Sequence, residues 1–350
     1  MKRKFSRKAL VALFAVSALA LSACSSGDDA SGDVKVSLIL KNQTNPFFVA
    51  MVKGAEAKAA ELGLDLTISS GKEEGDDAAQ IAAIENAISA KHAGIVITVM
   101  STNVNAAITK AREAGLLVIA LDTPTDPADI ADITFATDNR EAGRLIGQWG
   151  AKKLGGQKAV IALLNIFDDR VSPVDYLRDN GFLEGMGIPV NDPNKMADEA
   201  PKGKYSGGDY EIVGNVATGA NEDGGRSGME KLLAKNPNIN IVYTINEPTA
   251  AGACAALKAA KKTAIVVSVD GGLPGIENVK SGCIGATSQQ YPLLMADLGL
   301  QAIYDLVQTG KKPEVTPGKD FFDTGVKLIT DDPQDGVPSE STDYGIENAW

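Results

Sequence analysis

Polar side chains stand where several apolar runs of the chain end, and each of these runs reads as a buried strand. The residues are Asn or Asp in every case: Asn42, Asp122, Asp138, Asn165, Asn246 and Asp270. In parallel α/β sheets, ligands bind beyond the carboxyl ends of the strands. Asn and Asp also cap the helix that follows a strand, so any one of these residues is equally well explained without a ligand. Together they favour a polar ligand in one cleft.

The chemistry of these side chains suits a sugar. Each hydroxyl donates one hydrogen bond and accepts others, while a carboxylate accepts and Asn, Gln and Arg donate. Hydrogen bonds to charged groups contribute roughly 1.5 to 3 kcal/mol each. Phe47 and Phe48 follow Asn45 and Pro46 and offer aromatic surface to the apolar face of a sugar ring. Because neighbouring helical residues point about 100° apart, we expect at least one Phe to face the cleft.

Short apolar runs alternate with stretches of helical spacing along the chain. The strand-like runs are 34–40, 64–68, 94–99, 117–121, 133–136, 159–164, 241–245 and 264–269. Their nearly continuous hydrophobicity is typical of strands that are buried on both faces. The stretches 48–62 and 81–88 repeat apolar residues at helical spacing. The pattern predicts an α/β protein with two doubly wound parallel sheets and a break near residues 137–139.

The N-terminus reads as an export signal. A basic start precedes an apolar run from 9 to 21, shorter than the roughly twenty residues that span a bilayer. The run ends in Leu-Ser-Ala-Cys24, which resembles the lipobox of bacterial lipoproteins. We expect 1–23 to be a lipoprotein signal peptide, Cys24 to carry the lipid anchor, and 24–33 to be a flexible tether outside the cell membrane. An ordinary secreted protein is the alternative.

Composition excludes several classes of function. Lys and Arg number 34 against 45 Asp and Glu, a net charge of -11, so a nucleic acid is not an expected partner. One His and three Cys leave little material for a metal cluster or for histidine-based catalysis, and we expect no metal or cofactor. His92 reads as a solvated residue at a helix end. Cys254 and Cys283 either form a disulfide or are buried as small apolar residues.

Five motifs, in this order, carry a resemblance to a known family. They are Asn42-Gln-Thr-Asn-Pro-Phe-Phe48, Ile119-Ala-Leu-Asp-Thr-Pro124, Tyr243-Thr-Ile-Asn-Glu-Pro248, Val267-Ser-Val-Asp-Gly-Gly272 and Ala286-Thr-Ser-Gln-Gln-Tyr-Pro292. From about residue 34 to the end, the chain resembles the monosaccharide-binding lipoproteins of sugar ABC transporters, of the ribose- and fructose-binding group. The resemblance implies the type 1 periplasmic binding protein fold, in which two α/β lobes joined by three crossing segments close on one sugar. The lobes would comprise 34–137 with 291–317, and 138–290 with 318–350.

The resemblance also implies which residues contact the sugar. They are Asn45, Phe47, Phe48, Asp122, Thr123, Arg178, Asn246, Asp270 and Gln290. The two Asp residues would accept hydrogen bonds from hydroxyls, Arg178, Asn246 and Gln290 would donate, Asn45 would do either, and the Phe rings would stack. Without its motif, Arg178 reads as a charge on a helix surface.

Several positions depart from the ribose-binding pattern. Thr123 stands in place of an Arg, Ala220 and Asn221 in place of an aromatic residue, and Val269 in place of the aromatic residue before Asp270. The Leu-Asp-Thr-Pro, Ile-Asn-Glu-Pro and Ser-Gln-Gln-Tyr-Pro forms, with the ending 343–350, more closely resemble fructose-binding members. Fructose is therefore the first choice of ligand.

The function implied is that of a monomeric extracytoplasmic receptor, not an enzyme. It would capture one monosaccharide and deliver it to an ABC permease driven by an intracellular ATPase. A receptor that presents a sugar-like signal to a membrane sensor would have the same sequence features and differ only in its partner. An exported glycoside hydrolase with a carboxylate pair in the cleft is a less favoured alternative.

Overall fold

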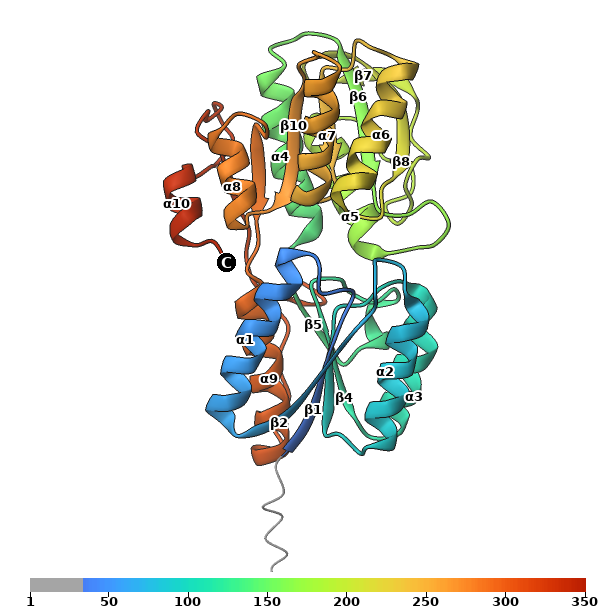
Figure 1. Ribbon diagram of the computed structural model, residues 1–350, viewed down its shortest axis with the longest axis vertical. Helices are drawn as coiled ribbons and strands as arrows, with labels where there is room; N and C mark the ends of the chain where they lie inside the picture. Colours follow the sequence, from blue (N-terminus) through green and yellow to red (C-terminus); the bar gives the residue numbers. More distant parts are fainter. Residues whose placement is uncertain (1–33) are drawn as a thin grey trace, which may run out of the picture. The chain divides into compact units, whose positions relative to one another are not determined.

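Two β-sheets, each with helices on both faces, make up the part of the chain that the computed structural model describes, residues 34–350 (Figure 1). Both sheets are mainly parallel, which confirms the predicted doubly wound α/β class. The predicted signal peptide, Cys24 and tether lie outside the described residues. No helix within 34–350 combines the length and the apolar character needed to cross a membrane.

The first sheet has six strands in the order β12-β5-β4-β3-β1-β2, all paired in parallel. Their bounds are β1 (Val34–Leu40), β2 (Leu64–Ser70), β3 (Gly94–Ile97), β4 (Leu117–Leu121), β5 (Ile133–Ala136) and β12 (Phe322–Asp323). One face packs against α1 (Pro46–Leu62) and α9 (Pro292–Thr309), and the other against α2 (Asp77–Ser89) and α3 (Asn105–Glu113) (Figure 1). The apolar residues of both layers are buried.

The second sheet has seven strands in the order β13-β11-β10-β9-β6-β8-β7, antiparallel only at its two edges. They are β6 (Ala159–Asn165), β7 (Lys202–Tyr205), β8 (Gly208–Ala217), β9 (Ile241–Thr244), β10 (Ile265–Asp270), β11 (Ala286–Gln289) and β13 (Lys327–Ile329). One face of this sheet is covered by α4 (Asn139–Lys153) and α5 (Pro173–Met186). The other face is covered by α6 (Glu222–Lys235), α7 (Glu247–Ala259) and α8 (Leu273–Lys280). The last helix, α10 (Thr342–Glu347), lies beside α8. Cys254 and Cys283, whose pairing the sequence left open, form a disulfide.

Three segments connect the two sheets, between β5 and α4, between β11 and α9, and between β12 and β13. We call the parts built on the first and second sheets the first lobe and the second lobe. The third crossing comes after Asp323, later than the boundary predicted at residue 318, because Phe322 and Asp323 pair with Phe135 and Ala136 of β5. That short pairing keeps the segment up to residue 323 in the first lobe.

Four glycines let α4 and α5 approach each other backbone to backbone. A Cβ atom placed at Gly143 or Gly147 of α4 would lie 2.2 Å from the carbonyl oxygen of Arg178 or Phe182 of α5. Gly181 and Gly185 of α5 meet Arg140 and Arg144 of α4 in the same way, also at 2.2 Å. Since such distances are far below van der Waals contact, larger residues would push the two helices apart. The spacing therefore fixes where α5, and Arg178 on it, lies.

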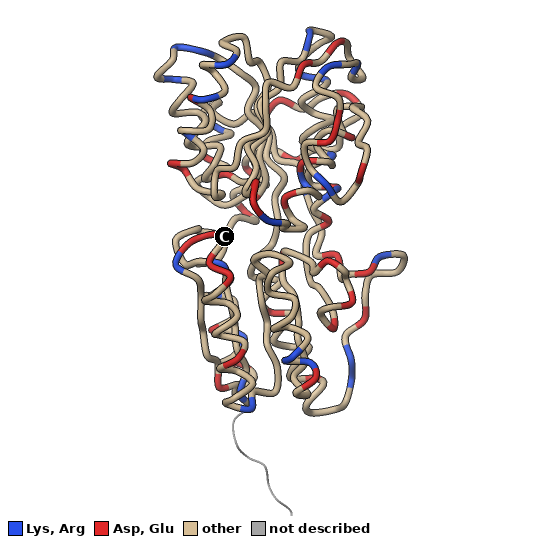
Figure 2. Tube along the Cα trace, turned by 90° about the vertical axis from the view of Figure 1, so that its right-hand side faces the viewer, with Lys and Arg blue, Asp and Glu red and all other residues tan. Residues whose placement is uncertain are grey.

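Charged side chains of both signs are spread over the helices of both lobes (Figure 2), but α5 also carries buried carboxyl groups. Asp179 is fully buried, and one of its oxygens accepts a hydrogen bond from the Asn165 side chain at 3.2 Å. Burial, reinforced by the nearby carboxylate of Glu199, raises the pKa of Asp179 well above its usual value. Burial likewise raises the pKa of Asp175 to about 7, although the N–H groups of Ile166 and Phe167 donate to it.

The close contact between α4 and α5 predicts what one added methyl group does to stability. Gly147→Ala should lower the free energy of unfolding by about 1 to 3 kcal/mol, because the new Cβ overlaps the Phe182 carbonyl. Gly228→Ala in α6 is the matched control, since its Cβ would meet side-chain atoms at 3.1 Å or more and Ala favours a helix. Urea denaturation measures both. Equal stability of Gly147→Ala and the wild type would show that the close approach is not required.

The buried carboxyls predict a loss of stability toward alkaline pH. A raised pKa means that the native state holds a proton which the unfolded chain releases near pH 4, so the stabilisation is complete below about pH 4 and is lost as the pH rises through the native pKa. The free energy of unfolding should therefore fall between pH 5 and pH 9, and fall less in Asp179→Asn. Urea denaturation at several pH values tests this, with the exposed Asp335→Asn as control. Identical slopes for Asp179→Asn and the wild type would contradict it.

Candidate functional site

Side chains from both lobes surround one small cavity, which we call the inner cavity. Eight of the nine predicted site residues line it: Asn45, Phe47, Phe48, Asp122, Arg178, Asn246, Asp270 and Gln290. Lys41, Glu74, Ile166, Val174, Ala220 and Ile245 complete the lining. The cavity measures about 30 Å³, room for about two water molecules. A sugar ring is larger, so its entry requires the lobes or these side chains to move apart.

Arg178 lies at the centre of the site and is 4% exposed. Its guanidinium group is 3.3 Å from Asp122 Oδ1 of the first lobe and 3.9 Å from Asp270 Oδ1 of the second. Nε donates to Asn139 Oδ1 at 2.8 Å and Nη1 to the carbonyl oxygen of Ile245 at 3.0 Å. One buried cation thus balances two carboxylates from opposite sides of the cleft.

Both carboxylates sit on unusual backbone. Asp122, just after β4, has φ 62°, a left-handed conformation that Asp tolerates better than most residues. Asp270, the last residue of β10, has φ 145°, in a region that is nearly restricted to glycine and costs about 1 to 3 kcal/mol. Such strain is typical of functional positions, where the surrounding structure holds a side chain in a required direction.

Burial sets the protonation of Asp270. It raises the pKa of this carboxyl to about 7, while Arg178 and the Gln290 amide, whose Nε2 donates to Asp270 Oδ1 at 2.8 Å, act in the opposite direction. The Oε1 atom of Gln290 is buried and has no hydrogen-bond partner among the described residues. An unpaired buried acceptor costs free energy, and a ligand hydroxyl would satisfy it.

Helix capping accounts for part of the pattern of polar residues at strand ends. Asn45 Oδ1 accepts from the N–H of Phe47 and caps α1, and Asn246 Oδ1 accepts from the N–H of Thr249 and caps α7. Asp138 caps α4 and does not line the inner cavity. Asn42 and Asn165 are also absent from its lining. Of the six residues at strand ends, Asp122, Asn246 and Asp270 therefore reach the inner cavity.

Both aromatic side chains of the Asn-Pro-Phe-Phe motif reach the inner cavity, where at least one was expected. The rings of Phe47 and Phe48 meet edge to face, with centroids 5.4 Å apart, and both also pack in the core of the first lobe. Trp350 also meets Phe47 edge to face, with ring centroids 5.5 Å apart. Phe47 is therefore held by contacts with two neighbouring aromatic rings.

Two charged residues in the lining were missed from the sequence. Lys41 is 2% exposed and lies 3.2 Å from Glu74 Oε1, while Glu74 Oε2 accepts from the Asn42 side chain. The signal in the sequence was a Lys that directly follows the apolar strand 34–40. Thr123, in contrast, does not line the inner cavity: its hydroxyl donates to Asp122 Oδ2 at 3.0 Å and holds that carboxylate.

The arrangement is built for binding through hydrogen bonds. The inner cavity offers carboxylate acceptors, the donors of Arg178 and Lys41, and an aromatic wall. Each of the two cations is next to a carboxylate, so no cation is left over for an anionic ligand. Within residues 34–350, no group of three or more His, Cys, Asp or Glu side chains is placed to hold a metal ion.

Known proteins share both the sequence and the fold. The ribose import binding protein RbsB of Haemophilus influenzae is 30% identical over 309 residues, which cover 88% of this chain and 96% of that protein. The D-allose-binding periplasmic protein of Escherichia coli is 26% identical over 302 residues, which cover 84% and 91%. A solved ABC transporter solute-binding protein from Agrobacterium vitis with bound D-fucose has a TM-score of 0.73 at 24% identity, with 90% and 100% of the two chains covered.

The family model described as periplasmic binding protein domain matches residues 36–312, most of the part of the chain that the structure describes. Together with the Haemophilus relative, matched over nearly its whole length, this shows that the chain belongs to the periplasmic binding protein family.

Proposed function

We propose that this chain is the extracytoplasmic sugar-binding component of an ABC importer, which captures one monosaccharide and delivers it to a permease. The observation that carries the proposal is the convergence of Asp122, Arg178, Asp270 and Gln290, from both sides of the cleft, on the inner cavity. The relatives named for ribose and allose support a sugar as the ligand class. Acylation of Cys24 would hold the protein at the outer face of the cell membrane.

The charge of the inner cavity favours a neutral ligand. Lys41 is next to Glu74, and Arg178 is next to Asp122 and Asp270. An anionic sugar, such as a sugar phosphate, would add a buried negative charge without a free cation to balance it. A neutral polyol instead accepts from the cations and donates to the carboxylates without changing the net charge.

Fructose is the first choice among neutral sugars. The motifs around Asp122, Asn246 and Gln290 have the forms that resemble fructose-binding members. Ala220 lines the inner cavity near the point where the ribose-binding pattern has an aromatic side chain. Ala is smaller than an aromatic residue and leaves more room there for a six-carbon sugar.

Binding would proceed by closure of the two lobes about the three crossings. Asn45, Phe48 and Asp122 belong to the first lobe, and Arg178, Asn246 and Asp270 to the second, so a ligand that contacts both sets stabilises the closed arrangement. Arg170 of the second lobe supports closure directly. It donates to the carbonyl oxygen of Gly75 at 2.6 Å and lies 3.1 Å from Asp77 Oδ2, both in the first lobe.

A panel of sugars tests the ligand class. We expect fructose to raise the melting temperature by several degrees, since ligand at a thousandfold excess over its Kd stabilises by about 4 kcal/mol. Ribose, allose, glucose, galactose, arabinose and myo-inositol should give smaller shifts. Thermal unfolding of the protein stripped of carried-over ligand measures this. A larger shift with another sugar would make that sugar, and not fructose, the proposed ligand. If no sugar gave a shift and the protein released reducing sugar from an oligosaccharide, a hydrolase would be favoured.

Asp270 should be needed for binding and dispensable for folding. Asp270→Ala should lower the affinity for the bound sugar by at least a hundredfold, because the sugar loses a carboxylate acceptor, Arg178 an ion-pair partner and Gln290 its acceptor. Asp270→Gly should lose affinity equally and unfold at a higher denaturant concentration than Asp270→Ala, since glycine adopts φ 145° without strain. Isothermal titration calorimetry and urea denaturation measure the two effects, with the exposed Asp335→Ala as control. Micromolar affinity retained in both variants would remove Asp270 from the site.

A further inference from the structure

A second and larger cavity adjoins the inner cavity. This outer cavity measures about 450 Å³. Its walls come from both lobes, and they include Pro46 and Glu73 of the first lobe, Glu222, Pro248 and Pro274 of the second, and Trp350. Asn45, Glu74, Ala220 and Asp270 line both cavities. Because these residues are common to both, the two cavities are immediate neighbours.

Ala220 is one of the residues that line both cavities. Its side chain ends at Cβ, so it takes up little of the space between them. Gly272, on the wall of the outer cavity, is required for a different reason: a Cβ atom there would lie 2.7 Å from the indole ring of Trp350. Small residues at both positions leave space for the indole ring and for a ligand beside it.

The walls of the outer cavity combine apolar surface with hydrogen-bonding groups. Pro46, Pro248 and Pro274 are apolar, and the half-buried Trp350 is held in place by its N–H, which donates to the carbonyl oxygen of Gln290 at 3.1 Å. Prolines and an indole ring provide the apolar surface against which the C–H face of a sugar ring packs.

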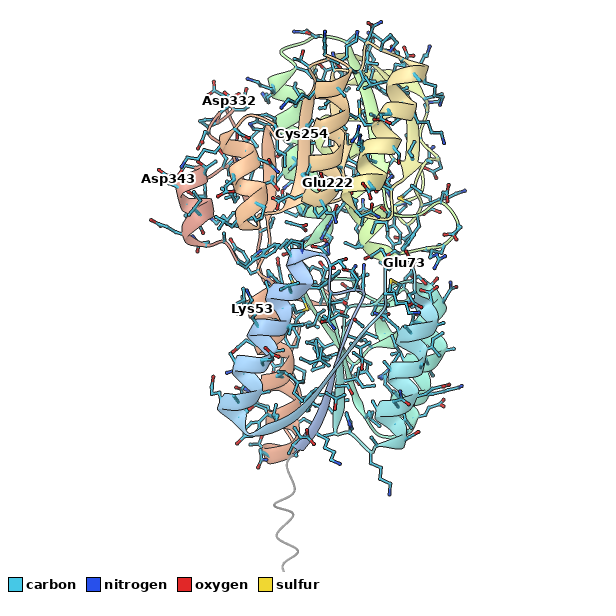
Figure 3. All side chains as sticks on the ribbon, viewed as in Figure 1. Lys53, Glu73, Glu222, Cys254, Asp332 and Asp343 are labelled. Carbon is cyan, nitrogen blue, oxygen red and sulfur yellow. A yellow bond between two sulfur atoms is a disulfide. The ribbon has the colours of Figure 1, made fainter. Side chains whose placement is uncertain are left out.

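All charged residues of these walls are acidic. Glu73 of the first lobe and Glu222 of the second, labelled in Figure 3, both line the outer cavity, and neither forms an ion pair within residues 34–350. Glu247 accepts hydrogen bonds from the N–H groups of Gly271 and Gly272 and from the hydroxyl of Thr287. Glu74 forms an ion pair with Lys41. No Lys or Arg contributes to the walls. Free carboxylates accept from hydroxyl groups and repel phosphate or carboxylate, so these walls suit a neutral sugar ring.

We infer that the outer cavity is a second sugar subsite, so that the protein binds, besides the monosaccharide, a disaccharide whose first ring occupies the inner cavity. The inference rests on the proposed function, because the first ring anchors the ligand through Asp122, Arg178 and Asp270. Glu73 and Glu222 accept from hydroxyls of the second ring, and Pro248, Pro274 and Trp350 cover its apolar face. A disaccharide is neutral, which satisfies both cavities.

The test uses fructose and the glucosyl-fructose isomers that carry glucose on each hydroxyl of fructose in turn. Only an isomer whose glycosidic bond points past Ala220 into the outer cavity fits. We therefore expect one or two isomers to bind with an affinity within tenfold of that of fructose, or more tightly, and the others not to bind. Fructose 6-phosphate should bind at least a hundredfold more weakly than fructose. Isothermal titration calorimetry on the mature protein measures all affinities.

A blocking variant locates the second ring. Ala251 of α7 lines the outer cavity but not the inner one. Ala251→Trp therefore places an indole ring in the outer cavity, and it should weaken the disaccharide at least tenfold while changing the affinity for fructose less than threefold. Ala259→Trp, two turns further along the same helix and exposed, is the matched control and should change neither affinity. Glu222→Gln should weaken the disaccharide alone.

The outcomes separate this inference from the proposed function. Fructose that binds while no isomer does overturns the second subsite and leaves the monosaccharide receptor intact. A disaccharide affinity that Ala251→Trp does not change also overturns it. Binding of neither fructose nor any isomer overturns the fructose assignment and the second subsite together.

Discussion

The guanidinium group of Arg178 is the interaction on which the cleft depends. It is a buried cation that lies between carboxylates of the first and second lobes, and it also binds Asn139 and the backbone of Ile245. Removing it would leave Asp122 and Asp270 buried without a counter-charge, which costs far more than the loss of one ordinary contact. The same group presents donors to the inner cavity. The charge balance that holds the lobes together is therefore also the chemistry that a neutral polyol requires.

The position of Arg178 depends in turn on the packing of α4 against α5. The glycines of both helices bring the two backbones into contact, and Asn139, at the start of α4, fixes Nε of the guanidinium group. Behind this layer, burial raises the pKa of Asp179 well above its usual value. It thereby disfavours a second carboxylate charge beside Asp175. The packing of α4 against α5 in the second lobe therefore holds the Arg178 side chain in one position.

The sequence was most informative where hydrophobicity alone decides the structure. All eight predicted strands are present, and seven of them are apolar and largely buried on both faces. The exception is β2, at the edge of the first sheet, whose residues are half-buried or exposed. Strand β8 was missed because its residues are mostly half-buried and include Asp209, Glu211 and Asn215, and β11 because Ala-Thr-Ser-Gln is polar. The polar side chains of β11 form hydrogen bonds with residues that are distant in the sequence. The hydroxyl of Ser288, for example, donates to the carbonyl oxygen of Ala142. Lys41 and Glu74 were missed because they lie in two separate loops and form their buried ion pair only once the fold brings these loops together.

The late return of the chain to the first sheet has a consequence for folding. Residues 292–323 supply α9, which covers one face of that sheet, and β12, which pairs with β5 almost two hundred positions earlier in the sequence. Until they arrive, Met295, Leu300 and Ile303 are missing from its core, and the apolar strand faces beneath them stay open. Neither lobe is a continuous stretch of polypeptide. Isolating the first lobe as a stable domain would require joining its two segments by circular permutation or by a designed linker.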